Sequence, residues 1–459
     1  MQKAIAKYGL AAHLALVAVA PLFLFPFFGD VAVAKALLWL SLPAAFWVVL
    51  EPSVRRGEMP HDARRRVARS IVHDPLFWTF LVVAAVAGFR ALNTGIALAY
   101  DYETRTWDVS APTLDVLPGS FASSGFLPFA AALAAMVVAI GCRHALGRSA
   151  RMAFLLSASF LSGVAAAVAL LLALRGNAVC AAAMADGVDT WLFRPGLAFA
   201  LHLVGGTVAL YAAFERGWTR AMPAAIIGLA GNAAGAFAFS SPLDAVEAAG
   251  VCLVVFLWVF FCAWRTLRGT NDFRLLVVFA VSVALGGLLA AATMPDAAVE
   301  AKLAAVTECD FLPSKFMEAR RVLSSAAFKA WATQPWTGVG VGAFRFSLRL
   351  HFTPADWAVL PRGAVAVPNG WWQLLVERGI VGALLFALPL GLLAYAYLKR
   401  FVAGCAARTM PGPSVLLAPL ALALAAASAL FGCSQLRADV LVALGAMLAV
   451  SAKSFPRKG

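Results

Sequence analysis

The stretch AFLLSASFLSGVAAAVALLLAL, residues 153–174, decides the fold class because its 22 residues include no charged side chain. A bilayer core is about 30 Å thick, and a helix needs about 20 residues to cross it. Hydrocarbon offers the backbone no water, so a continuous apolar run must bond its own N–H and C=O groups as a helix. The alternating pattern of a membrane β-barrel strand is missing from this run. The stretch therefore predicts a transmembrane helix.

Eleven further apolar windows predict a bundle of about twelve such helices. The windows are 9–28, 31–50, 75–92, 125–142, 195–214, 223–240, 246–264, 275–294, 380–398, 414–431 and 438–453. Hydrophobic residues make up 62% of the 459 residues and charged residues only 13%, with a mean hydropathy of +0.85. This composition provides too little polar surface for a soluble protein of this size. We expect an all-α, polytopic integral membrane protein.

The positions of basic residues indicate the orientation of the bundle. If the N-terminus is cytoplasmic, the segments on that side hold 22 Lys and Arg residues, against six in the short segments on the other side. Cytoplasmic loops of membrane proteins carry such an excess. We therefore expect a multi-pass membrane protein with both termini in the cytoplasm. The net charge of +14 does not indicate nucleic-acid binding, because the basic residues do not gather along one face.

One connection is much longer than a loop between helices needs to be. It divides the chain into a transmembrane bundle (1–294), a large external or periplasmic loop (295–379) and the last three spans with a cytoplasmic tail (380–459). The loop carries basic residues that the orientation rule does not require on that side: Lys302, Lys315, Arg320, Arg321, Lys329, Arg345, Arg349, Arg362 and Arg378. We expect the functional site in this loop.

Apolar and polar residues alternate from Phe344 to Phe352. In an extended chain Arg345, Arg349 and His351 share one face, and in a helix the two arginines are still neighbours. Two guanidinium groups that point together suit a pyrophosphate, since their planar donors match phosphate oxygens. An interfacial segment whose arginines reach lipid headgroups is the alternative.

A set of motif residues spans about 60 residues of this loop and the start of the next span. Arg320 precedes Pro335-x-x-Gly338-x-Gly340 and Phe344, and these are followed by Asn369, Gln373, Glu377, Gly379 and Gly382. In order and spacing this segment resembles the signature of the O-antigen ligase/polymerase family of membrane glycosyltransferases. About twelve spans and one large outer loop late in the chain are similar to that family as well.

The resemblance implies a glycosyltransferase of lipopolysaccharide or polysaccharide biosynthesis in the bacterial inner (plasma) membrane. Such enzymes pass a glycan from an undecaprenyl-pyrophosphate carrier to a hydroxyl of a glycan, a lipid A core or another acceptor, and they use no cofactor. Arg320, Arg345 and Arg349 are the expected pyrophosphate-binding residues, and the resemblance adds Arg194 at the outer mouth of the sixth span. Whether the reaction is ligation or polymerisation stays open.

The general base is the point at which this sequence departs from the family. The family's histidine before the asparagine falls on Pro368, so position 368 offers no imidazole. His351 is the remaining histidine of the outer loop and can take a proton from an acceptor hydroxyl. Glu377, Asp356 and Glu318 are the competing candidates.

Two other interpretations are weighed against the transferase. A transporter or flippase for envelope glycolipids would place charged residues at mid-membrane, and a non-catalytic envelope-assembly protein would need no base at all. The acidic residues of the outer loop lack the spacing of a metal site, so we expect no metal ion.

Overall fold

A computed structural model gives the structure of the protein. It describes residues 2–28, 30–50, 58–93, 98–101, 103, 106–109, 123–186, 195–215, 221–240, 250, 253, 257, 271–307, 314–340, 344, 351–352, 356, 369–406, 421, 424–426 and 438–450.

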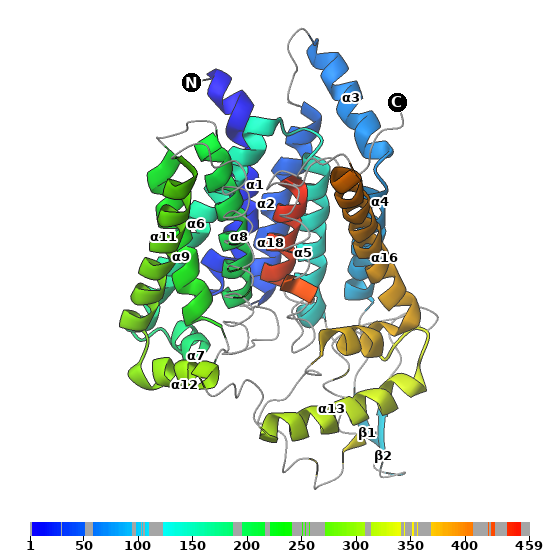
Figure 1. Cartoon of the computed structure of the whole chain (residues 1–459). Helices are drawn as coiled ribbons and strands as arrows, with labels where there is room; N and C mark the ends of the chain where they lie inside the picture. The colour runs from blue at the N-terminus through cyan, green and yellow to red at the C-terminus, as the bar shows by residue number, and fades with distance from the viewer. Residues whose placement is uncertain are drawn as a thin grey trace.

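A helical bundle forms the body of the molecule (Figure 1). Its helices are α1 (Gln2–Leu24), α2 (Asp30–Leu50), α4 (Pro75–Leu92), α5 (Ser123–Cys142), α6 (Arg148–Leu174), α8 (Pro195–Glu215), α9 (Met222–Ala238), α11 (Asn271–Thr293), α16 (Gly370–Ala406) and α18 (Ala438–Val450). Large apolar side chains remain exposed on several of them, among them Trp39, Phe46, Leu288 and Leu384. An apolar exterior of this kind suits contact with lipid.

Ten of the twelve predicted windows coincide with these helices. The windows 246–264 and 414–431 lie almost entirely outside the described residues. By length and composition, four helices within the described residues can each cross a membrane, or five if the bent pair α3–α4 forms one span. Four further apolar helices are shorter. A multi-pass membrane protein is therefore supported, and the number twelve stays a prediction.

Small residues bring α6 and α9 into close contact. A Cβ atom on Gly231 would lie 2.4 Å from the carbonyl oxygen of Gly163, so neither helix could approach this closely with a larger residue there. Next to this contact, Asn232 Nδ2 donates a hydrogen bond of 2.8 Å to Ser159 O. A polar side chain in the apolar window 223–240 is thus satisfied by the neighbouring helix.

Short elements cover the two ends of the bundle (Figure 1). The end called here the α13 end carries α7 (Ala178–Asp186), α12 (Asp296–Thr307), α13 (Ser314–Thr333) and the strands β1 (Leu98–Asp101) and β2 (Thr106–Val109). The opposite end, called the α3 end, carries α3 (Pro60–Val72). The two strands pair in antiparallel fashion. The expected all-helical fold therefore holds with the addition of one short hairpin.

The expected external loop contains regular structure where it is described. Helices α12 and α13 lie within residues 295–379, and α16 begins at Gly370, ten residues before the predicted window. Lys302 fastens α12 to the end of α9, because its Nζ donates hydrogen bonds of 2.8 Å to the carbonyls of Phe237 and Ala238. Burial lowers the pKa of Lys302 to about 8.

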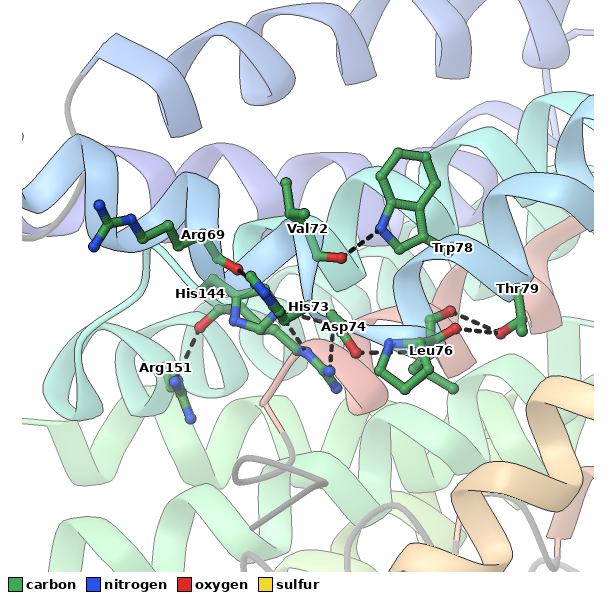
Figure 2. A network of polar contacts seen from close by, with 11 residues as sticks. Arg69, Val72, His73, Asp74, Leu76, Trp78, Thr79, His144 and Arg151 are labelled. Atoms are coloured by element: carbon green, nitrogen blue, oxygen red, sulfur yellow. Dashed lines mark hydrogen bonds and ion pairs between the residues drawn. The ribbon is translucent and has the colours of Figure 1, made fainter. Parts of the chain in front are cut away.

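A buried polar network fixes the α3 end of α4 (Figure 2). Asp74 caps this helix by accepting a 3.2 Å hydrogen bond from Leu76 N, and it forms an ion pair with Arg143 from the turn after α5. His144 Nε2 lies 2.8 Å from Asp74 Oδ2. Burial would raise the pKa of Asp74, but the His144 hydrogen bond and the Arg143 charge outweigh it and lower the pKa. The network joins the start of α4 to the turn between α5 and α6.

Candidate active site

A cavity of about 350 Å³ opens beside α13. Glu318, Arg321, Ser325 and Lys329 lie on one face of this helix because they follow one another at intervals of three or four residues. The cavity is also lined by His351, Phe352 and Asp356. The cavity therefore combines an imidazole, two carboxylates, a hydroxyl and two cations.

His351 has the protonation state that a general base needs. It is half-buried, and burial together with the nearby positive charge of Lys329 lowers its pKa below the ordinary value of 6.5. The imidazole is therefore neutral at pH 7 and can accept a proton. Asp356, a competing candidate for the base, lines the same cavity.

The predicted pyrophosphate arginines are distributed differently. Arg320 lies on α13 and is half-buried, but Arg321 is the arginine of this helix that lines the cavity within the described residues. Arg345, Arg349 and Arg194 lie outside the described residues, as does Pro368.

Glu377 lies away from the cavity lining, at the break inside α16. Its side chain is fully buried and its Oε1 accepts a 2.6 Å hydrogen bond from Gln373 Nε2. Glu377, one of the candidates for the base, is thus buried and hydrogen-bonded within α16. Asn369 begins this segment, since its side chain accepts a 3.1 Å hydrogen bond from Trp372 N and its carbonyl accepts one from Gln373 N.

The glycine motifs of the sequence contact each other directly. α16 is broken at Gly379, which has a φ of 65°, and the turn Pro335–Gly340 packs against this break. A break leaves N–H and C=O groups of the helix without their usual partners. The turn supplies those partners: Ile380 N donates to Pro335 O and Val381 N to Trp336 O, while Val339 N donates to Val376 O and Gly340 N to Glu377 O.

Only glycine fits at this contact. Gly338 has a φ of 73°, and a Cβ atom there would lie 2.4 Å from the backbone nitrogens of Arg378 and Gly379. A Cβ atom on Gly379 would lie 2.2 Å from Trp336 O. The spacing of the Pro-x-x-Gly-x-Gly and Gly-x-x-Gly motifs thus has a physical cause.

A small apolar core connects this contact to the cavity. Phe344 is fully buried and packs with Leu323, Ala326 and Val376. Ala326 also lines the cavity. Through Ala326 of α13, the core around Phe344 therefore adjoins the cavity.

Sequence reasoning missed two features of this site. The face of α13 that lines the cavity could have been found from the spacing of Glu318, Ser325 and Lys329. The contact made by Arg90 of α4 could not be predicted from the neighbouring residues. Its Nη2 donates a 3.2 Å hydrogen bond to Thr337 O, which is 247 residues away in the chain. Within the described residues, no group of three or more His, Cys, Asp or Glu side chains could hold a metal ion.

The fold and the site together define a multi-pass membrane protein with a polar site at one end of its bundle. Residues 233–387 match the O-antigen ligase family, and this segment contains α13, the glycine turn and the break in α16. The match confirms the resemblance that the motif residues predicted. A search of curated proteins gave no match.

Proposed function

We propose that this protein transfers a glycan from an undecaprenyl-pyrophosphate carrier to an acceptor hydroxyl on the outer face of the bacterial inner membrane. The observation that carries the proposal is the cavity beside α13, which brings a neutral histidine and two cations together within the family-matched segment. The α13 end then faces outward and the termini are cytoplasmic. The acceptor is a growing glycan, a lipid A core or another hydroxyl-bearing molecule.

The reaction assigns a distinct task to each kind of side chain. His351 takes the proton from the acceptor hydroxyl, whose oxygen forms the new bond to the anomeric carbon of the donor glycan. The bond from that carbon to the pyrophosphate breaks, and the leaving undecaprenyl pyrophosphate keeps the electron pair. Arg321 and Lys329 stabilise the charge that develops on the leaving group, with Arg320, Arg345, Arg349 and Arg194 as further candidates for this role.

Transfer by purified protein is the direct test. The protein in neutral-lipid nanodiscs is given undecaprenyl-pyrophosphate-linked oligosaccharide, together with either lipid A core or an oligosaccharide as acceptor. General-base help is typically worth about 10²- to 10⁴-fold in rate. We therefore expect His351→Ala to lose at least about 100-fold in rate while it still binds the donor.

A matched histidine variant controls for this result. His61 is exposed on α3, at the opposite end of the bundle, so His61→Ala should transfer at the native rate. If His351→Ala keeps full activity and Asp356→Asn or Glu377→Gln loses it, a carboxylate is the base. Native protein that binds the donor and transfers to neither acceptor would contradict the proposed function.

A further inference from the structure

Three charged side chains are buried together where α4 ends and α16 breaks. Arg90 is 6% exposed, Arg378 is 5% exposed and Glu377 is fully buried. Arg378 is within electrostatic reach of both Arg90 and Glu377. The three groups carry two positive charges and one negative charge.

The hydrogen bonds around Arg90 leave part of its guanidinium group unused. Nη2 donates to Thr337 O, but Nε and Nη1 are buried with no hydrogen-bond partner among the described residues. Burying donors of a charged group without partners is costly. An acceptor with negative charge would satisfy these donors of Arg90.

Arg378 reaches the same place from α16. Its guanidinium group stacks over the ring of Phe129 at 4.1 Å and faces Phe386 at 5.9 Å. A Cβ atom on Gly382 would lie 2.5 Å from Arg378 Cβ, so glycine at position 382 leaves room for the arginine to turn back along its helix.

Both arginines line one small cavity between α4 and α16. Its other lining residues are apolar or glycine: Val83, Val86, Ala87, Gly382 and Leu385. The volume is about 20 Å³, which holds one water-sized group such as a single phosphate oxygen. The flanks of the cavity expose Val82, Phe89, Val381 and Leu384, so a ligand with an apolar chain can approach along the lipid-facing side.

We propose that Arg90 and Arg378 form a binding site for the phosphate of a membrane lipid whose apolar chain lies along the seam between α4 and α16. The diphosphate of a polyprenyl carrier and the headgroup of an anionic phospholipid share this chemistry. Identifying the lipid as the polyprenyl carrier rests on the proposed function. Guanidinium groups suit this role because they stay charged and present several donors to phosphate oxygens.

A binding titration tests the site without any transfer reaction. The full-length protein in detergent is titrated with undecaprenyl pyrophosphate that carries no glycan, and the midpoint of thermal unfolding is followed. A ligand that binds the native state raises this midpoint as its concentration increases. We expect undecaprenyl pyrophosphate to raise it and phosphate-free undecaprenol not to do so.

Variants locate the site on the protein. Arg90→Gln and Arg378→Gln should each weaken the apparent affinity at least tenfold. Arg175→Gln should not, because Arg175 is exposed at the end of α6. If the arginine variants fail to fold, Ala87→Ile keeps both arginines and fills the cavity, and it should weaken binding as well.

The outcomes separate the possible ligands. An equal midpoint shift with phosphatidylglycerol would identify a phospholipid headgroup as the source of the phosphate. The site is refuted if native protein responds to neither phosphate-bearing lipid, if undecaprenol is equally effective, or if the foldable variants bind as tightly as native protein. Arginine variants that bind undecaprenyl pyrophosphate as tightly as native protein would refute this site and leave the proposed transfer at the α13 cavity standing. Native protein that binds no undecaprenyl pyrophosphate would contradict both proposals.

Discussion

Lys329 and His351 face the same cavity, and the charge of the lysine is one cause of the lowered histidine pKa. A base with a lowered pKa is deprotonated, and therefore active, from a lower pH upward. Removing the charge in Lys329→Gln should raise the pKa of His351 toward its ordinary value. The acidic limb of kcat/KM against pH should then move to higher pH, whereas a variant of Lys399, exposed on α16, should leave it in place.

The direction of this shift distinguishes a change in the pKa of His351 from a general loss of activity. Loss of a structural contact at Lys329 would lower the rate at every pH without moving the limb. An unchanged limb, or one that moves to lower pH, would show that His351 is not the titrating base.

Individual site residues were predicted from sequence to different extents. His351 and Asp356 were both predicted as site residues of the outer loop, and both line the cavity. This could be predicted because residues five positions apart in a loop stay close in space. The pairing of Glu377 with Gln373, and the contact of Arg90 with Thr337, depend on how distant elements pack. Local patterns in the sequence carry no information on such contacts.

At the scale of elements, the contact between the glycine turn and the α16 break should dominate stability. Gly379→Ala and Gly338→Ala combine a positive φ, which costs roughly 1–2 kcal/mol for alanine, with a backbone clash. Gly176 has a φ of 81° and nothing within 4 Å of a Cβ atom, so Gly176→Ala isolates the conformational cost. Gly391→Ala, helical and open, should stabilise by about 0.5–1 kcal/mol.

Thermal unfolding of the four purified variants ranks these effects. The midpoint should be highest for Gly391→Ala, lower for Gly176→Ala and lowest for Gly338→Ala and Gly379→Ala. If Gly379→Ala and Gly176→Ala unfold at the same temperature, the glycine turn does not lie close enough to Gly379 to clash with a side chain there.

Most helices of the bundle could be predicted from sequence because uncharged runs near 20 residues leave few alternatives in a bilayer. The early start of α16 could not, since Gly379 interrupts the helix and polar residues such as Gln373 and Glu377 precede it. The β1–β2 hairpin was missed because four-residue strands give too short a pattern to recognise.

At the scale of the whole molecule, the two ends of the bundle differ in chemistry. α3, with Arg64, Arg65, Arg66 and Arg69, lies opposite the end that carries α13 (Figure 1). This arrangement agrees with the orientation expected from the positive charges. Reporter fusions after Arg69 and after Arg408 should therefore behave as cytoplasmic, and a fusion near Asp356 as external. An external reporter at Arg69 would reverse the orientation and with it the proposed side of the reaction.

The ends of α4 give the bundle one further property. The helix is held at its start by the Asp74–Arg143 pair and near its finish by the hydrogen bond from Arg90 to Thr337. Its 18 residues measure about 27 Å, close to the hydrocarbon thickness of a bilayer. α4 thus fixes the distance between the Asp74–Arg143 pair and the glycine turn. A bilayer with a thicker or thinner hydrocarbon core would therefore have to stretch or compress its lipids around this fixed span.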